Sequence, residues 1–241
     1  MLFLNIESLR CFNTSRFFLF NNCEHNNAVD LRFFEIYRSA EYLELLALGV
    51  FNSVILTTFA GIIGFSVGVF LAVIRYQRVI VLGFLCASYT DFVRNTPLVV
   101  QMFFVTFGLP QLLGYAWPFW AHAILALTLN FCAYFSEIVW AGLKTVNKGQ
   151  IEAAKSMGLS KWKILWTILL PQAISKMFPS LNAQFIFLFL TTGIMSEISV
   201  KDLTYAGVFI DSRTFRSFEV FLTLTILYIL VALVFKFIKN I

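Results

Sequence analysis

The chain has 241 residues, of which 59% are hydrophobic, 17% are aromatic and only 13% are charged, and its formal net charge is +5. A soluble domain usually carries about 25% charged residues, so too little polar surface is present to cover a water-soluble globule, and the mean hydropathy of +0.81 agrees. The composition therefore favours a polytopic membrane protein. It assigns the excess of lysine and arginine to cytoplasmic loops and predicts no nucleic-acid partner.

Residues 1–40 differ from the rest in composition. They contain several asparagines and charges of both signs, and no uncharged apolar segment leads to a small-residue cleavage site, so a cleaved signal peptide is not expected. We interpret them as an N-terminal extension, extracytoplasmic or interfacial, ahead of a transmembrane domain over 41–241. The four cysteines of the chain form no CxxC pair or Cys/His cluster, so no metal site is predicted.

The first long apolar run is Leu45–Ile74, which has 30 residues and no Asp, Glu, Lys or Arg. A helix needs about 20 apolar residues to cross the hydrocarbon of a bilayer, so this run predicts one span with room for tilt. Gly61, Gly64 and Gly68 lie within it at the spacing of small residues that let two helices approach closely. Helix packing is a sufficient explanation for them.

The next uncharged stretch, residues 95–136, is too long for one helix. Glycines and prolines interrupt it, so we expect two spans joined by a short turn near 109–118, with the first span bent around Pro97. Two more apolar runs supply a fourth and a fifth span. The predicted fold is an all-α bundle of five transmembrane helices over about 45–74, 81–107, 119–142, 174–197 and 217–238.

Charges in the connections predict the orientation. The connection after the first span carries Arg75 and Arg78, the one after the third span carries five lysines from Lys144 to Lys163, and the turn between the second and third spans carries no Lys or Arg. Basic residues stay on the cytoplasmic side, so the N-terminus is expected outside and the C-terminus inside. The connection assigned outside carries basic residues against this rule, accompanied by acidic ones: Lys201, Arg213 and Arg216, with Asp202, Asp211 and Glu219.

The cytoplasmic loop 144–171 has the pattern of two short helices with a break between them. Asn147 and Gln150 have the N-x-x-Q spacing of a capping box at the start of the first helix. Gly158 stands where a helix end often needs a left-handed residue, and Ser160 can cap the second helix.

An apolar face and a proline complete this pattern. The face repeats at i, i+3, i+4 and i+7 and consists of Trp162, Leu165, Trp166 and Leu169. Pro171 is expected to disrupt the hydrogen-bond ladder before the fourth span. Such a helical pair can dock a cytosolic partner or can lie on the lipid as an amphipathic helix, and periodicity alone leaves both readings open.

Three ordered blocks carry a family resemblance. The loop contains Gly149-Gln150, Glu152-Ala153-Ala154, Gly158-Leu159-Ser160 and Leu170-Pro171-Gln172-Ala173. Upstream stand Arg94-Asn95-Thr96-Pro97-Leu98 and Ala133-Tyr134 with Glu137-Ile138. The first block resembles the EAA signature of permease subunits of ABC importers, and the other two resemble the RGTPL and AYxxEI blocks of the polar amino acid permeases, of the histidine and glutamine permease type. The resemblance covers roughly residues 45–238.

The resemblance implies a type I importer permease in the bacterial cytoplasmic (inner) membrane. Its EAA loop would form a coupling helix in a groove on a cytosolic ATPase dimer, which binds ATP and Mg; this chain would bind no cofactor and hold no catalytic residue. The coupling residues implied are Glu152, Ala153, Ala154, Gly158, Leu159, Ser160, Leu170 and Pro171. The other partners implied are a second permease subunit, identical or different, an extracytoplasmic solute-binding protein and membrane lipid.

The loop also contains a near match to a phosphate-binding motif, but the match lacks a glycine that such a motif needs. Residues 149–156 read GQIEAAKS, one residue away from GxxxxGK[ST]. Ala154 replaces the second glycine, which that loop needs to wrap its backbone N–H groups around phosphates, and no strand precedes the segment. We therefore expect ATP to be hydrolysed by a partner.

The candidate translocation path is a set of polar or conformationally unusual residues within or beside the spans: Asp91, Arg94, Asn95, Thr96, Pro97, Tyr134, Glu137, Thr191 and Thr192. Asp91 and Arg94 are three residues apart and can pair, which would lower the cost of charge in the bilayer. They can line the path or anchor the helix at the membrane boundary. Glu137 can line the path, or it can hold the coupling loop through Lys144 or a neighbouring helix.

The chain departs from the family pattern at a few positions. Ser175 and Trp140 stand where the family usually has arginine, and residues 190–194 read LTTGI where it often has KDTSL. The predicted function is a permease subunit for a polar amino acid. The alternative is an ion-coupled secondary transporter, a class that often shows internal repeats and midplane carboxylates; no clear repeat is present, and no nucleophile–base pair supports a membrane enzyme.

Overall fold

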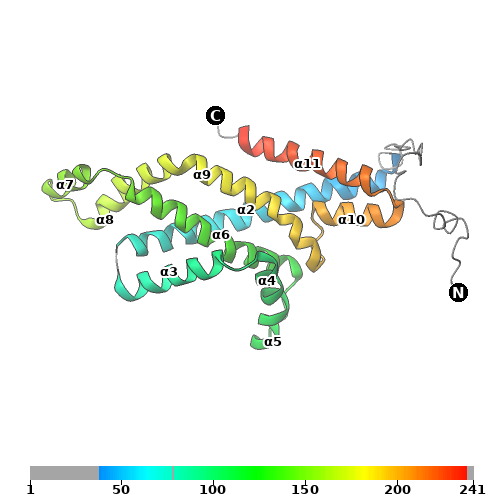
Figure 1. Ribbon diagram of the computed structural model, residues 1–241, viewed down its shortest axis with the longest axis horizontal. Helices are drawn as coiled ribbons and strands as arrows, with labels where there is room; N and C mark the ends of the chain where they lie inside the picture. Colours follow the sequence, from blue (N-terminus) through cyan, green and yellow to red (C-terminus); the bar gives the residue numbers. More distant parts are fainter. Residues whose placement is uncertain (1–37, 78, 238–241) are drawn as a thin grey trace, which may run out of the picture. The chain divides into compact units, whose positions relative to one another are not determined.

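The computed structural model describes residues 38–77 and 79–237, so almost all of the predicted extension 1–40 lies outside the described residues. Every regular element in these ranges is helical (Figure 1). Four helices are long and apolar enough to cross a membrane, and a bent pair of helices makes a fifth span if it is counted as one. In the described residues these four are α2 (Ala40–Tyr76), α6 (Phe119–Lys144), the segment Lys161–Ile198 that contains α9 (Leu170–Thr191), and α11 (Ser217–Phe237).

Shorter elements connect the long helices. The α-helices among them are α3 (Ile80–Arg94), α4 (Leu98–Phe103), α5 (Leu109–Leu113), α7 (Lys148–Ser156), α8 (Lys161–Ile164) and α10 (Leu203–Thr214). Two π-helical turns, η2 (Phe104–Gly108) and η3 (Leu165–Leu169), and one 3-10 helix, η4 (Thr192–Ile198), complete the series. The predicted all-α membrane bundle is confirmed, with the bent pair in place of its second span.

Helices α2 and α6 pack closely because α2 carries glycines on the shared face, as the sequence predicted. A Cβ built on Gly68 would lie 2.8 Å from the Phe135 Cβ and 2.9 Å from the Cys132 carbonyl oxygen. At Gly64, one turn away, a Cβ would meet its nearest atom at 3.6 Å, an ordinary contact. Gly68 therefore marks the closest approach, and Phe135 packs beside it against Phe65 and Phe185.

Gly68→Ala is expected to lower the free energy of unfolding by about 1–2 kcal/mol. Overpacking costs up to about 3 kcal/mol, and the better helix propensity of alanine returns about 1 kcal/mol. Gly64→Ala is the matched control and is expected to be neutral or slightly stabilising. Thermal unfolding of the detergent-solubilised protein measures both, and equal melting temperatures for the two variants would contradict the packing argument.

The second predicted span, 81–107, is sharply bent. Helices α3 and α4–α5 meet at 107° across a break at residues 95–97, because Pro97 is extended and begins the second helix. The bend at Pro97 was predicted, but the span was expected to end at residue 107. The chain stays helical through Gly108 and Pro110 to Leu113, and the turn is confined to residues 114–118.

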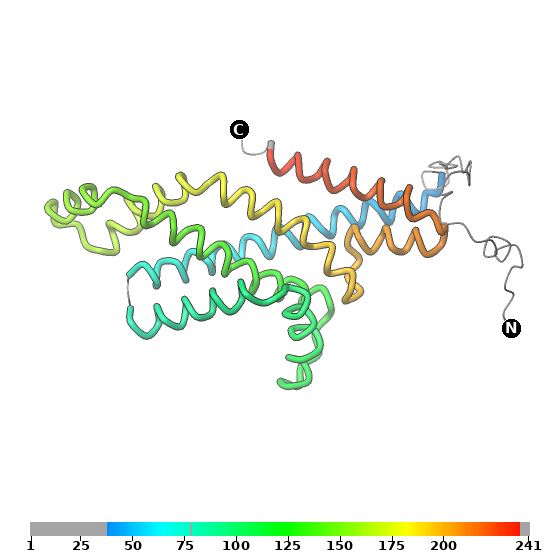
Figure 2. The backbone as a smooth tube through the Cα atoms, viewed as in Figure 1, coloured from blue at the N-terminus to red at the C-terminus, as the bar shows by residue number. Residues whose placement is uncertain are grey.

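A π-helical turn explains this continuation. Proline lacks an N–H and clashes with the carbonyl four residues earlier in an α-helix, and a π-turn widens the helix at that point. Turn η2 comes directly before the short helix that holds Pro110, and η3 comes directly before the helix that holds Pro171. Helix α8 consequently runs through η3 into α9, as Figure 2 shows. The α-helical hydrogen-bond ladder is therefore disrupted before Pro171, as expected, but the helix does not end there.

The connection between α9 and α11 folds as helix α10 after η4, which the charge count did not predict. Asp202 caps α10: its carboxylate oxygens accept hydrogen bonds from the backbone N–H of Tyr205 at 2.9 Å and of Thr204 at 3.2 Å. The Leu203 N–H donates to Ser53 Oγ on α2 at 3.1 Å. A second, smaller core joins the start of α2 to α10 and α11; its buried residues are Leu46, Leu203, Ala206, Ile210, Val220 and Leu224.

The stability of this region is expected to depend on pH through Asp202. Burial raises the pKa of its carboxyl from 3.8 to about 7, although the N–H donors of Tyr205 and Thr204 lower it. The folded state thus binds the proton more tightly than the unfolded state, so stability falls as the pH rises from 3.8 to about 7. Asp202→Asn keeps a capping side chain and removes the titration. A melting-temperature series over this range should slope downward in the wild type and be flatter in the variant; parallel curves would contradict the assignment.

Candidate functional site

The chain between α6 and α9 forms a bent helical pair at one end of the described helices (Figure 1). We call residues 147–164, which include α7 and α8, the elbow. The Asn147 side chain accepts from the Gly149 N–H at 2.9 Å to start α7, and the Ser160 hydroxyl accepts from the Lys163 N–H at 3.4 Å to start α8. Asn147 and Ser160 thus cap the two helices as predicted, but Asn147 accepts from Gly149 and the capping box with Gln150 is not formed.

Gly158 makes the bend. Its φ is +78°, in the left-handed region, and a Cβ at this position would have nothing within 4 Å. The Leu159 N–H donates to the Ala154 carbonyl at 3.2 Å, and the Gly158 N–H donates to the Lys155 carbonyl at 2.9 Å. This pair of bonds is the Schellman arrangement that ends many helices. Glycine is favoured here because of the backbone conformation, since the space around it is open.

The elbow has one face in the core and one face free. Ala154 is buried in the main hydrophobic core, and Ile151 and Leu159 pack against it. Glu152 and Ala153 are exposed, and Met157, at the bend, is 71% exposed. Small size at position 154 thus serves packing within the chain, and the outer surface offered to a partner contains a carboxylate, a methyl group and a thioether. Sequence reasoning did not single out Met157.

The predicted apolar face of the second helix is divided by the π-turn. Leu165 and Leu169 are buried, whereas Trp162 is 59% and Trp166 is 56% exposed. Tryptophan is enriched at the boundary between membrane and water. Of the remaining predicted coupling residues, Leu170 is buried in the core and Pro171 is exposed.

A charged cluster lies near the elbow, where α2, α3 and α6 meet. Arg75 Nη1 donates to Glu137 Oε2 at 2.8 Å, and Arg94 Nη1 lies 3.6 Å from the same oxygen. The Arg75 side chain is 9% exposed and that of Glu137 is 27% exposed. We call Arg75, Arg94 and Glu137 the Glu137 cluster. Its carboxylate offsets the charge of two guanidinium groups, of which that of Arg75 is the less exposed.

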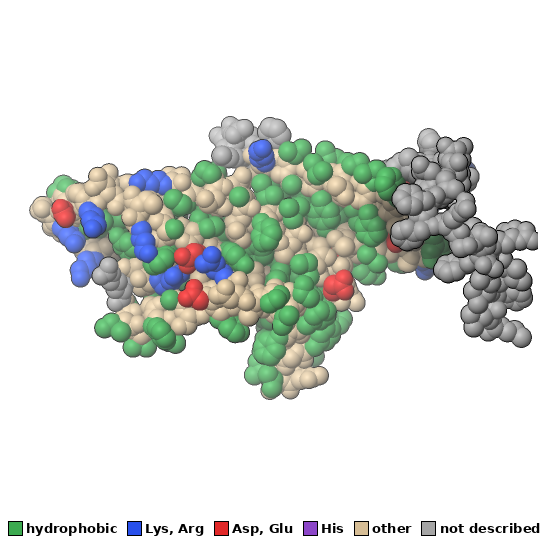
Figure 3. All heavy atoms as spheres, in the orientation of Figure 1, with side chains coloured by type: hydrophobic (Ala, Val, Ile, Leu, Met, Phe, Trp, Pro, Cys, Tyr) green, Lys and Arg blue, Asp and Glu red, His purple; other side chains and the backbone are tan. Residues whose placement is uncertain are grey.

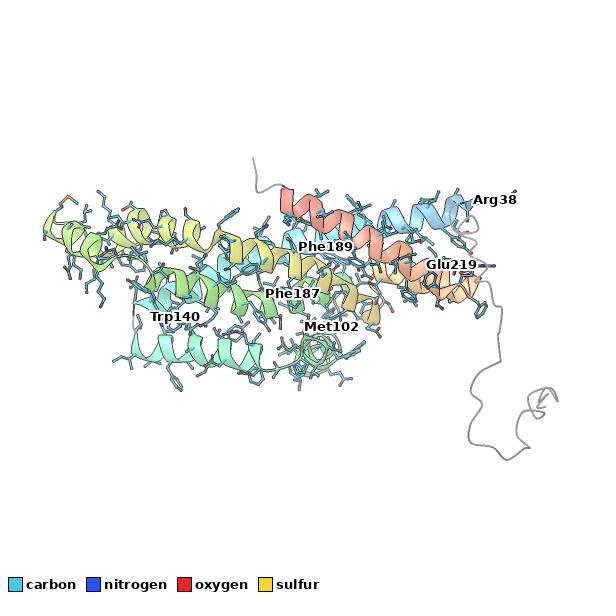
Figure 4. The ribbon with its side chains drawn as sticks, turned by 45° about the horizontal axis from the view of Figure 1, so that its top comes forward. Arg38, Met102, Trp140, Phe187, Phe189 and Glu219 are labelled. Atoms are coloured by element: carbon cyan, nitrogen blue, oxygen red, sulfur yellow. The ribbon has the colours of Figure 1, made fainter. Side chains whose placement is uncertain are left out.

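Trp140 links this cluster to Lys144 at the end of α6. The Arg75 guanidinium carbon lies 4.2 Å from the centroid of the Trp140 ring, and Lys144 Nζ lies 3.0 Å from it. Figure 4 labels Trp140 on α6, and Lys144 is the last residue of that helix. At the base of the elbow, Lys176 Nζ also donates to the Thr145 carbonyl at 3.0 Å. The tryptophan that replaces the family's usual arginine therefore holds two cations on its faces.

The break between α3 and α4 is held by a side-chain amide. Gln101 Nε2 donates to the Val93 carbonyl at 2.8 Å, to the Thr96 carbonyl at 3.2 Å and to Thr96 Oγ1. Asn130 Nδ2 on α6 donates to Gln101 Oε1 at 3.0 Å. A broken helix inside a membrane needs such replacements for its lost backbone bonds. Sequence reasoning missed both amides, although an asparagine inside an apolar span is a signal.

The structure brings some of the predicted path residues together and separates others. Arg94, Tyr134 and Glu137 are neighbours, and the Arg94 guanidinium carbon lies 5.7 Å from the Tyr134 ring centroid. Arg94 is paired with α6, so the expected pair with Asp91 was wrong. Thr191 and Thr192 are buried, and their hydroxyls donate to carbonyls of their own helix, Phe187 and Phe189. Arg75 was missed as a site residue because its partner is 62 positions away.

Comparison with known proteins agrees with this geometry. A family model described as "Binding-protein-dependent transport system inner membrane component" matches residues 45–241. The chain is 35% identical over 193 residues to the probable glutamine ABC transporter permease protein GlnP of Bacillus subtilis (strain 168), covering 79% of this chain and 88% of that protein. It is 34% identical over 180 residues to the arginine transport system permease protein ArtQ of the same organism, covering 74% and 82%.

Solved structures show the same fold. A crystal structure of an amino acid ABC transporter with histidines matches with a TM-score of 0.78 and 31% identity, covering 87% of this chain and 96% of that one. An inward-facing structure of the MetNI methionine ABC transporter matches with a TM-score of 0.73 and 19% identity, covering 84% and 96%.

Proposed function

Because the chain belongs to the family of binding-protein-dependent transport system inner membrane components, we propose that it is a permease subunit of an ATP-driven importer of polar amino acids. The observation that carries the proposal is the elbow between the third and fourth spanning segments, with its Schellman bend at Gly158 and its exposed outer surface. The names of similar permeases for glutamine and arginine support the substrate class.

In this proposal the elbow lies in the cytoplasm and docks on an ATPase dimer, which binds ATP and Mg. The N-terminus lies outside, the C-terminus lies inside, and an extracytoplasmic protein delivers the solute to a path between this chain and a second permease subunit. Movement of the elbow reaches the spans through its packed face. Ala154 and Leu159 transmit it to the main core, and Lys144 and Trp140 transmit it to the Glu137 cluster.

Uptake into sealed vesicles tests the function. The full chain is reconstituted with its second subunit, ATPase and solute-binding protein, and labelled glutamine, arginine or histidine is supplied. Uptake is expected to require ATP and every subunit, and to persist when an uncoupler collapses the ion gradient. Uphill accumulation by the chain alone, or loss of uptake with the uncoupler despite ATP, would instead indicate an ion-coupled transporter.

A further inference from the structure

A small basic cavity lies at the base of the elbow, beside the end of α2. Its volume is about 260 Å³. Its apolar side consists of Ile151, Ile164, Leu165 and Leu169, three of which are buried residues of the main core. The cavity therefore has a preformed apolar wall that the fold keeps in place.

The polar side of the same cavity carries net positive charge. It consists of Tyr76 and Gln77 at the end of α2, with Lys155 from the last turn of α7 and Lys161 from the first turn of α8. None of the residues that line the cavity is acidic. Two lysines thus line one small space with no carboxylate among its walls, and an anion bound there would offset their positive charge. Figure 3 shows lysine and arginine side chains gathered at the end of the molecule where the elbow lies.

Aromatic residues place the cavity at the depth of lipid headgroups. Trp162 and Trp166, on the helix that supplies the apolar wall, are 59% and 56% exposed, and Tyr76 is the last residue of α2. Tryptophan and tyrosine collect at the membrane–water boundary. The cavity lies beside these residues, and the exposed Met157 at the bend is not among its lining residues. Its lining residues also do not include Glu152 or Ala153, the other exposed residues proposed to face an ATPase.

We propose that this cavity binds the phosphate headgroup of an anionic phospholipid. Lys155 and Lys161 would pair with the phosphate, the Tyr76 hydroxyl and the Gln77 amide would donate hydrogen bonds to it, and the first part of an acyl chain would lie along the apolar wall. Basic pockets between transmembrane helices at the cytoplasmic side are suited to such headgroups. The inference does not depend on which solute is carried; it uses the proposed orientation only to assign the lipid to the cytoplasmic leaflet.

A lipid-binding measurement on the full chain, purified with the subunits that accompany it, tests the proposal. Phosphatidylglycerol and phosphatidylcholine of identical acyl chains are titrated, and bound lipid is counted by native mass spectrometry. The double variant Lys155→Gln, Lys161→Gln removes both cavity charges. The double variant Lys148→Gln, Lys163→Gln is the matched control, since it removes two charges from the same elbow at residues that do not line the cavity.

The wild type and the control are expected to prefer phosphatidylglycerol by about tenfold or more, and the cavity variant is expected to lose that preference. An equal loss in both double variants would show general attraction to the basic elbow and would overturn the proposal. So would unchanged lipid preference in the cavity variant, and so would inorganic phosphate displacing the bound lipid at equal concentration, which would indicate a site for a free anion. Loss of the ATPase with lipid preference intact would assign the two lysines to subunit docking instead.

Discussion

Replacing Glu137 with glutamine is expected to lower the free energy of unfolding by about 3 kcal/mol, because the Arg75 guanidinium would lose its carboxylate partner. Removing one partner of a buried ion pair costs about 3–5 kcal/mol because the other charge remains in a poorly solvating environment. The Arg75 guanidinium, bonded to Glu137 at 2.8 Å, has a side chain only 9% exposed. Thermal or denaturant unfolding of the purified protein in detergent measures the change.

Arg94→Gln is the matched control for this prediction. Arg94 lies farther from the carboxylate, at 3.6 Å, and its side chain is 39% exposed, so its loss is expected to cost less than about 1 kcal/mol. Because Glu137→Gln keeps the size of the side chain, a large loss would identify charge as the cause. Equal, small losses in both variants would show that the Glu137 cluster contributes little to stability and would return Glu137 to the candidates for the solute path.

Gly158→Val is expected to weaken association with the ATPase by about tenfold or more, while the chain still inserts into the membrane. A left-handed backbone costs an L-residue about 1–2 kcal/mol, and a β-branched side chain is among the least tolerant of it, so the bend would be populated less often. About 1.4 kcal/mol corresponds to tenfold in affinity. Titration of the ATPase onto the reconstituted permease measures the effect.

Gly158→Asn is the control for the bend. Asparagine tolerates the left-handed region better than other non-glycine residues, and the open space around position 158 admits its side chain. Affinity for the ATPase is therefore expected to stay within about threefold of the wild type. If the valine variant binds as tightly as the asparagine variant, the conformation at Gly158 does not control docking. If both fail, the side chain itself obstructs the partner.

Features determined by neighbouring residues could be predicted from the sequence. The capping by Asn147 and Ser160, the left-handed turn at Gly158 and the bend at Pro97 all depend on hydrogen bonds or steric contacts within about one helical turn. The glycines of α2 are also in this group, because their spacing places them on one face wherever the partner helix lies. The three family blocks added the expectation of a partner, and the match over residues 45–241 agrees with the family they indicated.

The two prolines show where a local rule fails. Pro110 predicted a helix end and Pro171 a disrupted hydrogen-bond ladder, yet both lie in helices that continue from π-turns. A π-turn widens the helix and so accommodates the proline ring, which would clash with a preceding carbonyl in a regular α-helix. Around the π-turn η3, Trp162 and Trp166 are exposed while Leu165 and Leu169 are buried, a division that the apolar repeat alone did not predict.

Charge pairing was decided by the tertiary structure. The spacing of three residues suggested an ion pair between Asp91 and Arg94. The packing of α2, α3 and α6 instead brings Arg75 and Arg94 to Glu137. By itself, the sequence determined the membrane class, the long apolar helices, the caps of α7 and α8 and the elbow, since these depend on composition and on contacts within a turn. Only the packed bundle determined which charges meet, which face of the elbow is free and where a basic cavity forms, because those contacts join residues far apart along the chain.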